Sequence, residues 1–248
     1  MPKHPKVARP EAGCDNKAPR THIFQKPKLE YAISIRDFPW SDKQKDFLKL
    51  ACDKETRVML VKGPAGTAKS LLAVNASLKS LNEKKIGDIV YIRNPVESSS
   101  FSLGFLKGGL EEKLSPYLQP MMDKLNESLS KSEIDKLLKE ERIRGMPLNF
   151  LRGLTFNVCN VIVDEAQNLK IEDLLLIMTR MGKFSKLFLC GDIMQSDIRN
   201  DSFEKIFRLF GDEESRNKGI HTFEFGSMDI FRSDILAFII EKFTSIQK

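Results

Sequence analysis

Short apolar runs alternate with helical patterns along most of the chain. Four runs, over residues 58–61, 89–92, 160–164 and 186–190, consist largely of Val, Ile, Leu and Phe. Continuous apolar runs of this length are typical of strands that are buried on both faces of a sheet. Residues 222–225 have a similar but weaker pattern and could form a last strand.

Apolar residues recur at helical spacing between these runs. The helical patterns cover 69–81, 171–181 and 201–210, and a further helix begins after Ser41, which can act as its N-cap. A last helix is expected over 233–243. Because strands alternate with helices, we predict an α/β fold in which a mostly parallel sheet is sandwiched by helices.

Two regions depart from this alternation. Residues 100–150 are more polar, and Lys, Glu and Leu recur from Leu110 to Glu141, so we predict an insertion that contains helices. Residues 1–38 interleave proline with lysine and arginine, which indicates a flexible basic arm. The arm could contact RNA or DNA phosphates, or it could be an inert solubilising tail. One globular domain is therefore expected over 39–248.

Composition and charge narrow the class of protein only slightly. Hydrophobic residues make up 41% of the 248 positions and charged residues 30%, as in ordinary globular domains. The net charge of +6 is compatible with nucleic-acid binding and equally with a lysine-rich surface. The four cysteines lack CxxC spacing, which argues against a disulfide framework or a zinc site. Without a signal peptide or a transmembrane stretch, we expect a cytoplasmic location and no membrane partner.

The first apolar run is followed by small residues that open a helix. These residues are Gly63, Pro64, Ala65, Gly66, Thr67, Ala68, Lys69 and Ser70. Small residues let the backbone curl so that its N–H groups point at a phosphate, and the helix N-terminus adds positive potential. In such a loop Lys69 reaches the β- and γ-phosphates, and Ser70 binds Mg²⁺. The strand–loop–helix context favours this interpretation over a glycine-rich turn before a core helix.

The loop departs at one position from the Walker A pattern GxxxxGK[ST]. Ala68 stands where the pattern has glycine. A methyl group there costs little if the backbone angle φ is negative, but on the order of 1 kcal/mol if φ is positive. In the second case the alanine could weaken nucleotide binding or slow turnover.

Two acidic residues, Asp164 and Glu165, end the third apolar run. In P-loop folds the ligand lies at the carboxyl ends of the strands. Asp164 could therefore hold Mg²⁺, and Glu165 could orient or deprotonate an attacking water. Such a pair alone is more often a solvated strand end, and the preceding phosphate loop makes the functional interpretation the stronger one.

Three further residues are weaker candidates for the site. Gln195 follows the fourth apolar run and could hydrogen-bond the γ-phosphate or the attacking water. Arg93 and Arg232 could contact phosphate or nucleic acid, and Arg232 could stabilise transition-state charge as an arginine finger. A polar turn at Gln195 and two ordinary surface arginines remain alternatives.

Taken together, these motifs resemble the PhoH family, which is related to the core of superfamily-one helicases. The resemblance covers roughly residues 40–240 and rests on residues 63–70, 93–97, 103–106, 112–113, 116–117, 120, 141–142, 152–153, 164–168, 191–195 and 229–232. It implies a RecA/helicase-like P-loop NTPase core that binds ATP and Mg²⁺ and hydrolyses ATP. It further implies RNA or single-stranded DNA as a partner and a homo-oligomer, with a hexameric ring as one form.

The resemblance also assigns two residues near the loop. Gln44 looks like the glutamine with which related helicases read adenine, and Arg93 lies where they place nucleic-acid contacts. Two other classes stay open. The first is a nucleotide-binding regulator with little catalysis, motivated by Ala68. The second is a small-molecule P-loop kinase, against which Glu165 argues, because a kinase needs no water activator.

Overall fold

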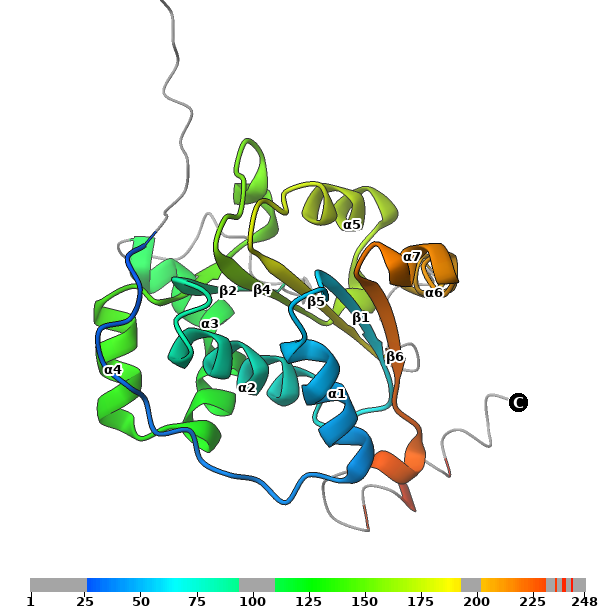
Figure 1. Ribbon diagram of the computed structural model, residues 1–248, viewed down its shortest axis with the longest axis horizontal. Helices are drawn as coiled ribbons and strands as arrows, with labels where there is room; N and C mark the ends of the chain where they lie inside the picture. The colour runs from blue at the N-terminus through cyan, green and yellow to red at the C-terminus, as the bar shows by residue number, and fades with distance from the viewer. Residues whose placement is uncertain are drawn as a thin grey trace, which may run out of the picture.

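The fold is known from a computed structural model (Figure 1). The structure describes residues 26–93, 110–192 and 202–230, together with Ile235, Phe238, Ile239 and Lys242. The first part of the predicted basic arm, residues 1–25, lies outside the described residues.

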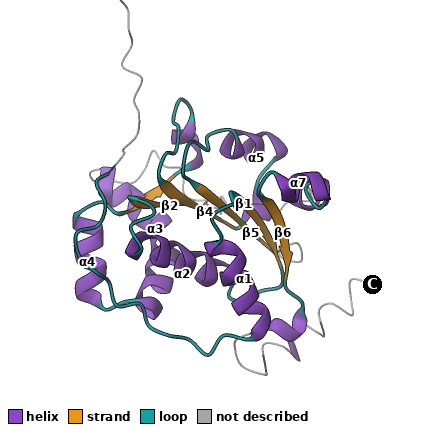
Figure 2. Cartoon of the chain, viewed as in Figure 1, coloured by secondary structure: helices purple, strands orange, loops and turns teal. Residues whose placement is uncertain are grey.

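A parallel sheet forms the centre of the described part of the chain (Figure 2). Its strands are β1 (Val58–Lys62), β2 (Asp88–Arg93), β3 (Ile143–Met146), β4 (Cys159–Asp164), β5 (Lys186–Gly191) and β6 (Ile220–Glu224). The spatial order is β3-β2-β4-β5-β1-β6, and every pairing is parallel. The predicted α/β fold with a parallel sheet is therefore confirmed.

Helices cover both faces of this sheet (Figure 1). One face carries α1 (Asp42–Cys52), α2 (Lys69–Asn82), α3 (Leu110–Ser128) and α4 (Lys131–Lys139). The other carries α5 (Ile171–Met178), α6 (Ser202–Leu209) and α7 (Glu213–Asn217). Short 3-10 helices cover Leu148–Leu151, Ala166–Asn168 and Ser227–Asp229. The expected last helix over 233–243 lies largely outside the described residues, although the four described there are helical.

The apolar runs are continuous because successive side chains enter two different cores. In β1, Met59 and Val61 pack with α1 and α2, whereas Val58 and Leu60 pack on the side of α5 and α6. The same alternation occurs in β2, β4 and β5. A parallel sheet that helices cover on both faces must have apolar side chains on each face, so its strands are apolar at successive positions. Within the described residues, no helix is long and apolar enough to cross a membrane.

The segment 26–38, which the sequence assigned to the flexible arm, packs against the domain. Leu29 and Ile33 are almost completely buried in the core on the α1–α4 face. The Ile33 amide donates to Asn82 Oδ1 over 2.9 Å, and the Arg36 amide donates to the Ser128 carbonyl over 2.8 Å. The predicted boundary at residue 38 is therefore wrong. Every second residue from Leu29 to Ile35 is apolar, and these side chains pack into or against the core of the domain.

The predicted helical insertion contains α3 and α4, but it also supplies an edge strand. Residues of β3 pair in parallel with β2, and Arg144 forms an ion pair with the buried Asp88. Helix α3 contacts β2, β3 and α2. The insertion is thus part of the sheet and one of its covering layers, and it brings α3 beside the helix that follows the phosphate loop.

Candidate nucleotide-binding site

The carboxyl ends of the central strands converge at one edge of the sheet. The last residues of β1 and β5, Lys62 and Gly191, lie opposite each other, and so do Arg93 of β2 and Asp164 of β4. Because all strands are parallel, the loops that follow them open on the same side of the molecule. The phosphate loop follows β1 and ends where α2 begins at Lys69.

The loop has the left-handed turns that a phosphate cradle requires. Gly66 has φ +83°, and Ala68 has φ +63°. Thr67 is fully buried, and its hydroxyl donates to the Pro64 carbonyl over 2.9 Å. The positive φ at Ala68 decides the question left open by the sequence, because an alanine there costs roughly 1–2 kcal/mol. The loop therefore keeps its shape at the expense of backbone strain.

Lys69 folds back over this loop. Its ammonium donates to the Gly63 carbonyl over 2.7 Å and to the Pro64 carbonyl over 2.9 Å. Burial lowers the pKa of Lys69 below its ordinary value, and the carboxylates of Asp192, Asp164 and other acidic groups partly oppose this. A half-buried ammonium whose described hydrogen bonds go to neutral carbonyls is favourably placed to gain from an incoming anion.

Ser70 and Asp164 meet across the site. The Ser70 hydroxyl donates to Asp164 Oδ1 over 2.5 Å. Oδ2 of the same carboxylate accepts a hydrogen bond from the buried phenol of Tyr91 on β2, and the Lys124 ammonium of α3 lies 3.7 Å from it. Burial alone raises the pKa of Asp164. Lys124 and the two hydroxyls outweigh it, so the pKa lies below its ordinary value and the group is a carboxylate.

Glu165 is held in a strained position beside this carboxylate. Its backbone is left-handed, with φ +57°. The Gln167 side-chain amide donates to Glu165 Oε2 over 2.7 Å, and Arg93 Nη2 lies 3.7 Å from Oε1. Gln167 also accepts from the Asp192 amide over 2.9 Å, which ties the end of β4 to the end of β5. A left-handed backbone at a non-glycine residue costs energy, so the surrounding contacts must hold Glu165 in this conformation.

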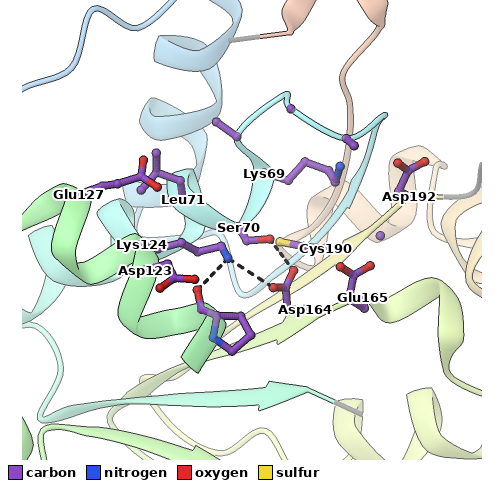
Figure 3. A pocket seen from close by; sticks show the side chains of 15 residues that line it. Lys69, Ser70, Leu71, Asp123, Lys124, Glu127, Asp164, Glu165, Cys190 and Asp192 are labelled. Atoms are coloured by element: carbon purple, nitrogen blue, oxygen red, sulfur yellow. Dashed lines mark hydrogen bonds and ion pairs between the residues drawn. The ribbon is translucent and has the colours of Figure 1, made fainter. Parts of the chain in front are cut away.

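These groups surround one cavity of about 440 Å³ (Figure 3). The loop, Lys69, Ser70, Asp164, Glu165 and Asp192 line one side, and α3 contributes Pro120, Asp123, Lys124 and Glu127 on the other. The volume lies within the range of small-molecule and cofactor sites. The α3 residues and Tyr91 were not foreseen from the sequence. Helix α3 falls in the polar insertion, and Tyr91 has the pattern of an ordinary core residue.

The other predicted site residues have different outcomes. Gln44 is fully buried, accepts from the Ser41 amide over 3.0 Å and has its side-chain amide 3.5 Å from the Thr67 carbonyl. The residue caps α1 and contacts the loop, and its role in reading adenine stays a prediction. Arg93 reaches the site by an ion pair with Glu165. Gln195 and Arg232 lie outside the described residues.

The parallel sheet, the loop between β1 and α2 and the acids at the end of β4 define a nucleotide-binding P-loop protein. Residues 38–244 match the family model described as PhoH-like protein. The chain belongs to this PhoH-like family.

Curated relatives agree with this family. A PhoH-like protein of Bacillus subtilis is 35% identical over 181 residues, 73% of this chain and 56% of that one. A PhoH-like protein of Mycobacterium tuberculosis is 33% identical over 198 residues, 80% and 55% of the two chains. The chain thus spans about half the length of the curated relatives it matches. A solved Pif1 helicase from Candida albicans has a TM-score of 0.37 and 16% identity over 77% of this chain and 40% of its own, a similarity too low to support an argument.

Proposed function

We propose that this protein is a Mg²⁺-dependent ATPase coupled to RNA or single-stranded DNA. The observation that carries the proposal is the 2.5 Å contact between the Ser70 hydroxyl and Asp164. It joins the first turn of the helix after the phosphate loop to the acid at the end of β4, the two positions from which P-loop NTPases hold their metal ion. Family membership supports the same class of activity.

The residues at the site fit a triphosphate with Mg²⁺. The loop amides and the N-terminus of α2 would bind phosphate oxygens, and Lys69 would exchange its carbonyl partners for the β- and γ-phosphates. Ser70 and Asp164 would hold Mg²⁺, which would neutralise developing phosphate charge. One carboxylate suffices, because Mg²⁺ takes its remaining ligands from phosphates and water. Among the described residues, no group of three or more His, Cys, Asp or Glu forms a metal cluster, which agrees with this mode.

Glu165 is our candidate for the general base. Gln167 and Arg93 contact its two carboxylate oxygens and hold the side chain at the cavity, which Glu165 lines. It would accept the proton of the water that attacks the γ-phosphate, while ADP departs. We further propose that Gln195 orients this water and that Arg232 stabilises transition-state charge. The choice of ATP rests on the family resemblance, which assigns Gln44 to the reading of adenine.

The nucleic-acid partner and a ring-shaped homo-oligomer are proposals of the same kind. The net charge of +6 and the basic residues of the N-terminal segment are compatible with the nucleic-acid partner. The family resemblance supports both the partner and the oligomer. If phosphate-backbone contacts drive binding, single-stranded RNA should stimulate phosphate release, and the stimulation should fade as salt rises. Stimulation that does not depend on salt would argue against such contacts.

The direct test of hydrolysis is phosphate release from ATP by the wild-type protein and by Lys69→Ala. The wild type should turn over only with Mg²⁺, and Lys69→Ala should lose at least about a hundredfold in rate, because the transferred phosphoryl group loses its cation. Lys131→Ala, which removes an exposed lysine at the start of α4, is the matched control. Turnover that is equal in Lys69→Ala and the wild type would refute the proposal.

One observation favours a second candidate, a nucleotide-binding regulator with little catalysis. Ala68 holds the loop in a left-handed conformation that glycine adopts without cost. Calorimetry with ATP, combined with a turnover assay, separates the two candidates. Tight binding without phosphate release would favour the regulator, and turnover with Mg²⁺ would favour the ATPase.

A further inference from the structure

Helix α3 places a cation on the acid that the proposed function assigns to the metal. Lys124 Nζ lies 3.7 Å from Asp164 Oδ2 and donates to the carbonyl of Pro120, one turn earlier in the helix, over 2.9 Å (Figure 3). The two side chains are 21% and 10% exposed. Two opposite charges at this separation, on side chains that are largely buried, interact more strongly than an ordinary surface salt bridge.

The other positive groups at the site are engaged elsewhere. Lys69 bonds two loop carbonyls, and Arg93 lies beside Glu165. The hydroxyls of Ser70 and Tyr91, which also contact Asp164, are neutral donors. Among the ion pairs described for this carboxylate, the one with the ammonium of Lys124 is therefore the contact that supplies a full positive charge within 4 Å.

We propose that Lys124 is a tethered cation that competes with the divalent metal for Asp164. In the nucleotide-free protein, the ammonium neutralises the carboxylate and keeps metal affinity low. When nucleotide and metal enter together, phosphate oxygens offer the ammonium a new anionic partner inside the same cavity, and Asp164 becomes free to bind the metal. The inference rests on the proposed function, because it takes Asp164 as the metal ligand.

The consequence is ordered binding. To hold a metal alone, Asp164 would have to lose the ammonium that the insertion helix supplies, whereas the phosphates of a bound nucleotide would draw Lys124 away from Asp164. The Lys124 ammonium also donates to the backbone of α3. Binding of nucleotide would therefore change a contact of the insertion helix in addition to the contacts of the phosphate loop. The residue is a positioning residue, since it acts on the metal through Asp164.

The test measures metal binding and needs no turnover. Mn²⁺, a spectroscopic substitute for Mg²⁺, is titrated into the nucleotide-free protein, and free Mn²⁺ is followed by electron paramagnetic resonance. Lys124→Gln, which removes the charge and keeps a donor, should bind Mn²⁺ at least about tenfold more tightly than the wild type. Lys124→Arg should stay close to the wild type. Lys131→Gln, which changes net charge equally at an exposed site, is the control. Lys124→Met replaces the glutamine variant if the latter unfolds.

The outcomes separate the inference from the proposed function. The same titration with ADP present tests the metal site itself, because binding in the wild type should be lost in Asp164→Asn. If that loss occurs and Lys124→Gln binds Mn²⁺ no more tightly than the wild type without nucleotide, the tethered-cation proposal is wrong while the metal site stands. If Asp164→Asn binds Mn²⁺ as the wild type does with ADP, the metal assignment fails and the inference falls with it.

Discussion

The phenol of Tyr91 donates a hydrogen bond to Oδ2 of Asp164 across the parallel pair of β2 and β4. Both residues are buried. Burial, together with the neighbouring carboxylate, raises the pKa of Tyr91 far above its ordinary value, so the phenol stays protonated and remains a donor. A residue in the apolar core of the sheet thus fixes the orientation of the proposed metal ligand.

Tyr91→Phe should lower the free energy of unfolding by about 1–3 kcal/mol, because it removes a charge-assisted hydrogen bond from a buried carboxylate while it keeps the ring. Urea unfolding measures the change. Tyr31→Phe is the control, since it removes the hydroxyl of a half-buried tyrosine whose charged neighbours are Glu140 and Arg142 instead of Asp164. Equal losses in the two variants would show that the contact with Asp164 has no special weight.

Ala68→Gly should stabilise the protein by up to about 1 kcal/mol. Glycine removes the strain of the left-handed backbone, and its greater freedom in the unfolded chain offsets part of the gain. Ala65→Gly, at a position in the same loop that does not have positive φ, should instead be destabilising. Thermal unfolding of both variants tests this, and a lower midpoint for Ala68→Gly would contradict the strain argument.

Acid should weaken the contact between the 26–38 segment and α4. Glu133 accepts from the Ser130 hydroxyl and from the Ser34 amide, each over 2.6 Å, and these bonds hold its pKa below the ordinary value. The unfolded chain therefore binds the proton more readily. The contribution of Glu133 is fully present above about pH 4.3 and is lost as pH falls through the lower, folded value.

Glu133→Gln isolates this contribution, because it keeps an acceptor and removes the titration. Urea unfolding at pH 7 and at pH 3 should show a smaller loss of stability in Glu133→Gln than in the wild type. Glu172→Gln, at an exposed position near the start of α5, serves as the control for one carboxylate fewer. An identical pH dependence in the wild type and Glu133→Gln would refute the assignment.

The periodicity of the sequence was sufficient to predict the buried strands and most helices, because burial on both faces leaves continuous apolar runs. Strand β3 was missed because Ile143–Met146 is short and contains Gly145, and Pro147 follows it. Its stability depends on pairing with β2, which no local pattern reveals. The segment 26–38 was misjudged for a related reason, since its few apolar residues gain a partner only in the folded domain.

At the site, sequence spacing located the loop, Lys69, Ser70 and the acids, because a strand–loop–helix unit places them at one edge of any parallel sheet. The partners of Asp164 could not be inferred in this way. Tyr91 reaches it through the register of β2 and β4, and Lys124 through the packing of α3. The sequence likewise left open whether φ of Ala68 is negative or positive, and the structure shows that it is positive.

The proposed function requires one pocket in which the phosphate loop and Asp164 act on the same nucleotide and metal. Calorimetric titration of ATP, with Mg²⁺ or with a chelator, tests this for the wild type and Asp164→Asn, with Ser70→Ala as a second variant. The wild type should bind ATP at least about tenfold more tightly with Mg²⁺, and both variants should lose most of this gain. A Mg²⁺-dependent gain that persists unchanged in Asp164→Asn would show that the acid at the end of β4 does not hold the metal.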